Sequence, residues 1–312
     1  MTQILSLISP EFVVQASDRR VTFVPTGRIG EDNHNKAVFF CGHTAWAFTG
    51  VASVGATKTA EWMANTVALA HSLQGAIEEL RARATRRLHN YPRDIRRLAF
   101  VGVGFASQVF TGKSWVNVAP YPILTVVSNF LDEHEHWRAE ALDDFSARSW
   151  TIPEQRSFLL FESGVPLRAG ARTQLVRDLN SAFIHRVRPP AVARLLARAI
   201  KSEHASNPTG PVGNNVMCTV VTQDAPSGDP NYSGGLWPLA DDAQEADYFR
   251  LPAVDPPSKY YFYVPAKPES RIHFGPDSVC VGIQMRNVKM HPVGPPENRE
   301  WTATAKVRNR TI

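Results

Sequence analysis

The stretch that decides the fold is Thr2-Gln-Ile-Leu-Ser-Leu-Ile-Ser-Pro-Glu-Phe-Val-Val-Gln-Ala-Ser-Asp-Arg-Arg20. Its two largely apolar runs, 4–8 and 12–17, have the length of strands. Ser9-Pro-Glu11 between them is typical of a turn. The stretch therefore predicts a strand–turn–strand unit that starts just after Thr2 and ends at the charged triplet Asp18-Arg-Arg20.

Thr2 offers unusual chemistry, because a small residue after the initiator Met1 allows the cell's aminopeptidase to remove that methionine. Thr2 would then carry a hydroxyl nucleophile and a free α-amino base on one residue. An α-amino group has an ordinary pKa of about 8, low enough to accept the hydroxyl proton. Further along, Asp18 follows Thr2 at sixteen residues, and Gly50 follows Lys36 at fourteen.

Three other residue types could support such a nucleophile. A buried Lys36 beside Thr2 would favour the neutral amine and stabilise the developing oxyanion of the hydroxyl. A buried lysine is costly without a partner, and Asp18 is the obvious carboxylate. Gly50, at a strand-to-helix turn, could present its backbone N–H to a tetrahedral oxyanion.

Residues 2 to about 65 resemble the N-terminal-nucleophile (Ntn) hydrolases of the proteasome β type, including bacterial members that need only Met removal. The matching elements are Thr2, the segment 13–20, the strand 36–40, the turn 47–50 and the helix that follows. The resemblance implies an α+β fold, the four-layer αββα sandwich. It makes Thr2 the nucleophile and base, Lys36 the electrostatic activator, Asp18 the orienting carboxylate and Gly50 the oxyanion donor.

Each of these residues also has a purely structural interpretation. Thr2 could belong to a frayed start, and Asp18 could sit in a surface turn with solvated charges. Lys36 could be a gatekeeper at a strand edge, protecting the apolar run 37–40 from aggregation. Gly50 could be a plain turn glycine. The functional interpretation is favoured because all four positions fall where one active site would require them.

The resemblance also places a supporting serine near Ser163, although a Ser-Gly turn explains that position equally well. After the last predicted helix the family carries an Asp and a Ser-Gly pair that buttress the nucleophile. The present chain has Gly213 there but lacks the Asp, and Asn207 is the nearest substitute. This departure puts proteasome-like catalysis in doubt.

The rest of the first 225 residues alternates strands and helices. We expect four strands within 2–50 and a helical region over 53–90, with one apolar face that includes Ala60, Met63 and Val67. Further strands are expected at 98–104, 121–127, 157–161 and 216–222, and two more helices at 173–184 and 190–204. The order of strands, two helices, strands, two helices and a strand is the order of the αββα sandwich.

The composition changes near residue 226. Twelve of the chain's 23 prolines fall in the last 87 residues. We therefore expect an Ntn domain at 1–225 and a Pro-rich C-terminal extension of unknown role at 226–312, packed on that domain, with disorder as the alternative for 226–250 and for the tail after 296. Residues 260–264 and 279–284 could form strands in it.

Composition describes an ordinary globular protein, with 43 % hydrophobic and 20 % charged residues and a net charge of +5 over 312 residues. The three cysteines are far apart, which suits a reducing cytosol. There is no signal peptide and no run of transmembrane length, so we expect a cytoplasmic location and no membrane association.

Two other patterns are weaker. The segment Asp132-Glu-His-Glu-His136 could bind a metal if it were a strand, but an exposed acidic loop is the simpler interpretation. Seven arginines between 81 and 97 have only Tyr91 as a neighbouring aromatic, so we expect a solvated helix face or a subunit contact and no nucleic acid. We expect no metal and no cofactor.

The leading functional hypothesis is a threonine hydrolase that cleaves amide bonds, with a peptide as the expected substrate. The alternatives are a non-catalytic scaffold or assembly subunit and an amidase for a small metabolite. A homo-oligomer is also expected, because Trp62 and Val67 extend the apolar surface of the first helical region beyond one stripe and the neighbouring arginines could meet acidic residues of a second copy.

Overall fold

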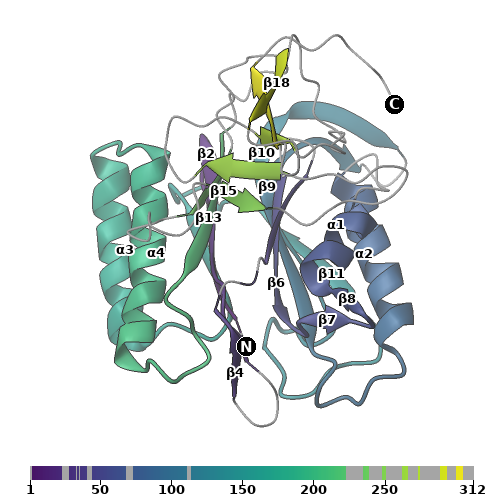
Figure 1. Ribbon diagram of the computed structural model, residues 1–312. Coiled ribbons are helices and arrows are strands. Elements are labelled where there is room, and N and C mark those ends of the chain that lie inside the picture. Colours follow the sequence, from purple (N-terminus) through teal and green to yellow (C-terminus); the bar gives the residue numbers. More distant parts are fainter. Residues whose placement is uncertain are drawn as a thin grey trace.

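The computed structural model describes residues 2–22, 28–32, 34, 36–40, 44–67, 73–110 and 114–222, together with six short strands beyond residue 234. The expectation of a mixed α+β protein is confirmed, since antiparallel sheets and four helices make up the described part (Figure 1). Cys41, Cys280 and the predicted strand at 279–284 lie outside the described residues.

The first sheet contains the strand–turn–strand unit that opens the chain. Its order is β12-β1-β2-β13-β14, and the neighbours are antiparallel. Central β1 and β2 are buried along their whole length because both faces of the sheet are covered. The strands are β1 (Gln3–Ile8), β2 (Phe12–Asp18), β12 (Leu159–Gly164), β13 (Val216–Thr222) and β14 (Gly235–Pro238).

The second sheet has the order β11-β10-β9-β6-β5. Its long central hairpin, β9–β10, is about twice the length that the sequence indicated, and β11 is a strand that the sequence did not predict. The strands are β5 (Ala37–Phe40), β6 (Thr44–Gly50), β9 (Leu98–Phe110), β10 (Trp115–Ser128) and β11 (Ser146–Trp150).

The expected helical region at 53–90 is partly wrong. It begins with a small hairpin, β7 (Ser53–Val54) and β8 (Thr57–Lys58), and only then come α1 (Thr59–Val67) and α2 (Leu73–Leu88). Gly55 takes a φ of +66° in the hairpin turn, a conformation that ends any continuous helix there. A second short hairpin, β3 (Val21–Thr22) and β4 (Ile29–Glu31), lies between β2 and Lys36.

The later helices fall where the sequence predicted them. They are α3 (Ala169–Ile184) and α4 (Pro189–Ser206), with prolines in the first turn of α4, where a missing N–H costs nothing. The pair packs on the first sheet through a core that includes Leu7, Val14 and Leu196. Figure 1 shows both helices beside β2 and β13.

Two further cores complete the packing. Ile4, Val13 and Val101 belong to the core between the two sheets. Phe48 and Leu80 belong to the core between the second sheet and α1–α2. The sheets thus lie face to face, and each carries a helix pair on its outer face (Figure 1).

The residues beyond 234 add strands in two ways. β14 pairs with β13, so the first sheet continues across the boundary that the sequence placed at 225. The others form a separate antiparallel sheet in the order β15-β16-β17-β19-β18. They are β15 (Tyr248–Arg250), β16 (Phe262–Pro265), β17 (His273–Phe274), β18 (Lys289–Val293) and β19 (Glu300–Thr304), and β16 overlaps the strand expected at 260–264.

Candidate active site

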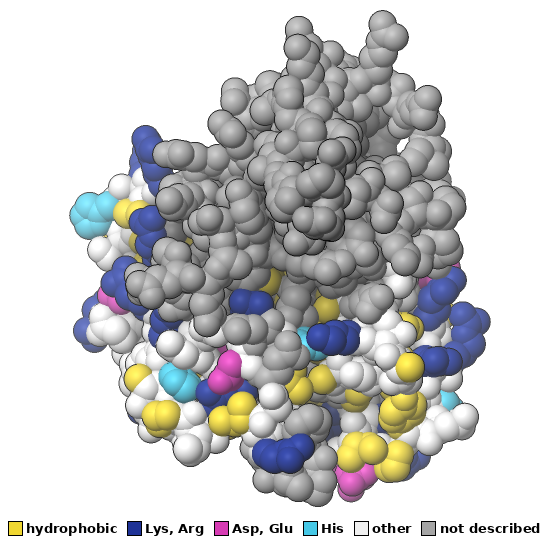
Figure 2. All heavy atoms as spheres, viewed as in Figure 1, with side chains coloured by type: hydrophobic (Ala, Val, Ile, Leu, Met, Phe, Trp, Pro, Cys, Tyr) yellow, Lys and Arg dark blue, Asp and Glu magenta, His cyan; other side chains and the backbone are white. Residues whose placement is uncertain are grey.

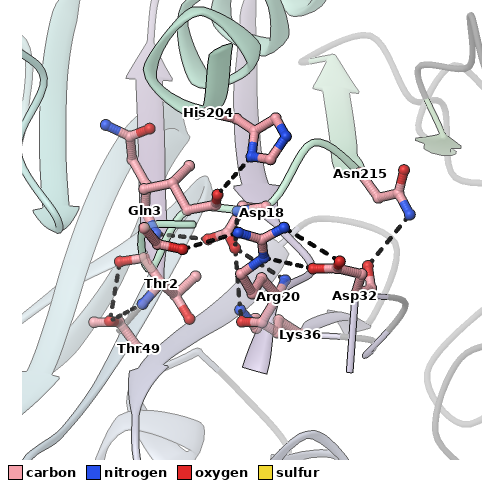
Figure 3. Close-up of polar contacts among 12 residues, drawn as sticks. Thr2, Gln3, Asp18, Arg20, Asp32, Lys36, Thr49, His204 and Asn215 are labelled. Carbon is pink, nitrogen blue, oxygen red and sulfur yellow. Dashed lines mark hydrogen bonds and ion pairs between the residues drawn. The ribbon is translucent and has the colours of Figure 1, made fainter. Parts of the chain in front are cut away.

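Thr2 is fixed at the buried entrance to β1, with only 4 % of its surface exposed. Its carbonyl accepts hydrogen bonds from the Val165 N–H at 3.0 Å and from Thr49 Oγ1 at 3.3 Å, and its N–H donates to Thr49 Oγ1 at 3.4 Å (Figure 3). Thr49 lies on β6, so these bonds tie the residue to both sheets. The interpretation of Thr2 as a frayed start is wrong.

Asp18, the last residue of β2, is fully buried and accepts backbone N–H groups from three segments. The Gln3 N–H donates to Oδ1 at 2.7 Å, and the N–H groups of Arg20 and Gly213 donate to Oδ2 at 2.9 and 3.1 Å. Three backbone donors therefore fix both carboxylate oxygens in position. Asp18 is therefore not a surface-turn residue, and its carboxylate binds the backbone N–H of Gln3, the residue directly after Thr2.

Lys36 is the positive partner of that carboxylate. Its side chain is 2 % exposed, and Nζ lies 3.5 Å from Asp18 Oδ2 and donates to the carbonyl of Arg20. Burial lowers the pKa of Lys36 below its ordinary value, and the charge of Asp18 opposes that shift. The buried ion pair predicted from the sequence is present, and the gatekeeper interpretation of Lys36 is wrong. The reach of Lys36 to the Thr2 hydroxyl stays a prediction.

Gly50 ends β6 in a conformation that requires glycine. Its φ is +108°, and a Cβ there would stand 2.0 Å from the carbonyl oxygen of Arg97. The turn-glycine interpretation therefore accounts for the residue by itself. Its position directly after Thr49, which contacts Thr2, keeps it beside the site, and its role as an oxyanion donor remains a prediction.

Ser163 lies on β12, opposite Ile4 of β1. Because side chains alternate along a strand, Ser163 shares the inter-sheet face of its neighbour Ile4, and Thr2 continues that same alternation. Its hydroxyl is buried and has no hydrogen-bond partner among the described residues. Ser163 is thus placed diagonally across from Thr2, one strand away, and its supporting role stays a prediction.

The loop between α4 and β13 reaches the site without Asn207. Asn207 is exposed, and its carbonyl accepts the Gly210 N–H at 2.9 Å within the turn. The loop instead contacts Asp18 through the Gly213 backbone N–H. The interpretation of Asn207 as a substitute for the missing Asp is therefore wrong.

Sequence reasoning missed several residues around Thr2. Thr49 bridges its N–H and carbonyl, and Arg20 joins the ion pair to the loop after α4. Gly164 packs against the Thr2 carbonyl, where a Cβ would stand 1.7 Å from the oxygen. Nothing in the local sequence marks these positions, because each is defined by a contact with a distant segment.

Gly164→Ala should destabilise the protein strongly. Gly164 has a φ of +83°, and the added Cβ would collide with the Thr2 carbonyl and with Thr49 Oγ1 at 2.8 Å. Strain and displacement of this kind cost on the order of 1–3 kcal/mol or more. The matched control is Gly170→Ala, in the first turn of α3, where an added Cβ meets nothing within 4 Å. Chemical denaturation compares the two, and an equal stability of both variants would contradict the placement of Thr2.

The described residues hold no group of three or more His, Cys, Asp or Glu side chains that could bind a metal. The segment 132–136 is an exposed turn, in which Asp132 accepts the N–H groups of His134 and His136. Among the described helices, none has the length and apolar character needed to cross a membrane.

Comparison with known proteins does not identify a family for this chain. No protein-family model matches the chain, and no curated protein does. Among solved structures, it is similar to a Gly-1 mutant of Anbu from Hyphomicrobium sp. strain MC1, with a TM-score of 0.41 and 13 % identity, covering 71 % of this chain and 82 % of that one. A TM-score of this size identifies neither a shared fold nor a shared chemistry.

Proposed function

We propose that this chain is an N-terminal threonine hydrolase that cleaves amide bonds, with Thr2 as nucleophile after removal of Met1. The observation that carries the proposal is the position of Asp18. Its buried carboxylate holds both the Gln3 N–H, next to Thr2, and the Lys36 ammonium. Residues from β1, β2 and the start of β5 thereby meet at one buried point (Figure 3).

We also propose that the packing of the two sheets and two helix pairs is the αββα sandwich of the Ntn hydrolases. In support, one helix pair covers the outer face of each sheet, and Thr2 lies at the end of a strand between the sheets. The resemblance of residues 2–65 to the proteasome β type agrees with this assignment, which leaves residues 226–312 as an addition to that fold.

In the proposed reaction, the free α-amine of Thr2 takes the hydroxyl proton as Oγ1 attacks the carbonyl carbon of the substrate. The negative charge that develops on the substrate oxygen is met by the Gly50 N–H. When the C–N bond breaks, the leaving amine takes the proton and the acyl group stays on Oγ1 as an ester. Water then hydrolyses the ester by the same proton route and restores Thr2.

The ion pair supports this chemistry electrostatically. A cation in a site shielded from water acts more strongly than one in bulk solvent. The Lys36 charge would favour the neutral, basic form of the amine and stabilise the oxygen of the hydroxyl as it loses its proton. Asp18 keeps that lysine in place, and Ser163, with its unpartnered hydroxyl, could orient the amine.

Intact mass and acylation by a peptide β-lactone test the proposal together. We expect purified protein to lack Met1 and to gain the mass of one lactone, since Oγ1 opens the ring to an ester and no atom leaves. Peptide mapping should place the adduct on Thr2. Retained Met1 with no adduct would contradict catalysis and favour a scaffold. Acylation without turnover of peptides would favour a small-molecule amidase.

Self-association through the helix layers remains a proposal, but Trp62 and Val67 do not extend the apolar surface as the sequence suggested. Val67 is buried and Trp62 stacks on Phe100, so both face the protein's own core. Among the described residues of the four helices, the large apolar side chain that is exposed is Ile184, at the end of α3 and 77 % exposed. Lys and Arg side chains gather over the helices on both flanks of the face in Figure 2.

We expect a homo-oligomer whose stability depends on salt, because a basic helix layer would meet acidic residues of a second copy. Light scattering at micromolar concentration, at low and high salt, checks this. A monodisperse particle of 34.6 kDa under both conditions would contradict self-association.

A further inference from the structure

We propose that Arg20 and Asp32 are positioning residues for Lys36, and that Asp32, by holding the Arg20 guanidinium, keeps the Lys36 ammonium in place beside Asp18. The proposal deepens the hydrolase function above and rests on it for its catalytic meaning. Its physical core, a coupling between Asp32 and Lys36, can be measured without any reaction.

Arg20 spans the site with both its backbone and its side chain. Its N–H donates to Asp18 Oδ2 at 2.9 Å, and its carbonyl accepts the Lys36 ammonium. One peptide segment therefore contacts both members of the buried ion pair. Any rotation of this segment would change the distance between Asp18 and Lys36.

The guanidinium of Arg20 fixes that segment from the other side. It is buried, with only 5 % exposure, and it binds Asp32 in a two-pronged pair, Nε to Oδ1 at 2.6 Å and Nη2 to Oδ2 at 3.2 Å. Nη1 donates to the carbonyls of Pro208 and Gly210 at 2.7 and 2.9 Å. The fork geometry of arginine suits such a pair and orients the side chain.

The loop after α4 is docked by the same group of contacts. Asn215 Nδ2 donates to the Asp32 carbonyl at 3.3 Å, and the Arg19 N–H donates to the Asn215 carbonyl at 2.9 Å. Gly213, which holds Asp18, lies within this loop. Asp32 and Arg20 thus connect Lys36 to the loop after α4, where the resemblance implied an Asp that this chain lacks.

Charge balance explains why Asp32 is needed. Arg20 and Lys36 are two buried cations, and Asp18 is one buried carboxylate. A second negative charge offsets the surplus, and Asp32 supplies it from a position 43 % exposed. The charge of Asp32 raises the pKa of Lys36, and the charge of Arg19 lowers it. Among the described residues, Asp18, Arg19 and Asp32 are the charged groups that act on Lys36, and Arg20 contacts it through its carbonyl.

Asp32→Asn tests the proposal, with Asp143→Asn as a matched control. Asp143, 54 % exposed, also pairs with a buried arginine, Arg96, at 2.5 Å, and its second oxygen pairs with the exposed Arg93 at 2.7 Å, but neither arginine belongs to the site. Asparagine in either place loses the charge and turns an N–H donor toward the arginine. Both variants should lose similar stability in chemical denaturation.

The first readout is an NMR titration of lysine labelled at ¹³Cε, with the Lys36 signal assigned by its absence in Lys36→Arg. We expect Lys36 to lose its proton at lower pH in Asp32→Asn than in wild type, and at the wild-type pH in Asp143→Asn. Asp32→Glu, which restores the charge, should return the titration toward wild type. An unchanged Lys36 titration in Asp32→Asn would overturn the proposal.

The second readout is the rate of Thr2 acylation by the β-lactone as a function of pH. The alkaline fall of this rate should move to lower pH in Asp32→Asn alone, so that at the pH where wild-type Lys36 is half titrated only this variant is acylated more slowly than wild type. If wild-type Thr2 is not acylated at all, the hydrolase function fails, while the NMR titration still decides whether Asp32 controls Lys36.

Discussion

We expect the peptide β-lactone to acylate the Thr2→Ala variant at least about 10⁴-fold more slowly than the wild-type protein. Loss of the Thr2 hydroxyl removes the atom that accepts the acyl group, so no ester can form at residue 2 and any residual adduct must lie on another residue. All the hydrogen bonds described for Thr2 are made by its backbone N–H and carbonyl. The substitution should therefore leave the denaturation midpoint close to wild type.

Thr2→Ser and Thr2→Val are the matched controls for this experiment. Serine keeps a hydroxyl and should retain acylation, whereas valine keeps the shape of threonine without the hydroxyl and should lose it. All three side chains are small enough for Met1 removal to be compared by intact mass. An adduct on Thr2→Ala at the wild-type rate would contradict the assignment, and its position would identify the true nucleophile, with Ser163 as the first residue to inspect.

The sequence predicted the parts of the fold that depend on periodicity. The apolar runs at 4–8 and 12–17 became β1 and β2, and β13 has the predicted bounds of 216–222. The mistakes fall where local pattern competes with turn chemistry. The predicted helical region began at 53, ahead of its apolar face at Ala60, but Gly55 with its positive φ and the β-branched Val54 and Thr57 form a hairpin there.

Only part of the candidate site was predictable from the sequence. Thr2, Asp18 and Lys36 could be found because their chemistry is rare in combination, and the structure brings Asp18 and Lys36 together. Gly164, Arg20 and Asp32 could not, because their importance comes from close approaches across the fold. Gly164 touches the carbonyl of a residue 162 positions earlier, and Arg20 meets carbonyls about 190 positions later.

Asp18→Ala should destabilise the protein more than Lys36→Met, and both should abolish acylation of Thr2. Removing one partner of a buried ion pair costs about 3–5 kcal/mol. Lys36→Met leaves a carboxylate that still accepts three backbone N–H groups, so its charge remains partly compensated. Asp18→Ala leaves the ammonium unpaired and also orphans those three donors, each at about 1–3 kcal/mol.

We expect this order because Asp18 makes more hydrogen bonds in the site than Lys36 does. A natural domain is stable by only about 5–15 kcal/mol, so either loss is a large share of the total. Urea denaturation of the two variants and of the double variant checks it. The double variant should lose less than the sum of the two single losses, because the first change already removes the pair.

Glu78→Ala is the control, since it breaks a pair with Arg81 in which both side chains are 49 % exposed, worth at most about 1 kcal/mol. If Lys36→Met proved the more damaging variant, Asp18 would hold the fold through the ammonium alone. The three backbone donors to Asp18 would then add nothing to stability, contrary to the geometry of the site.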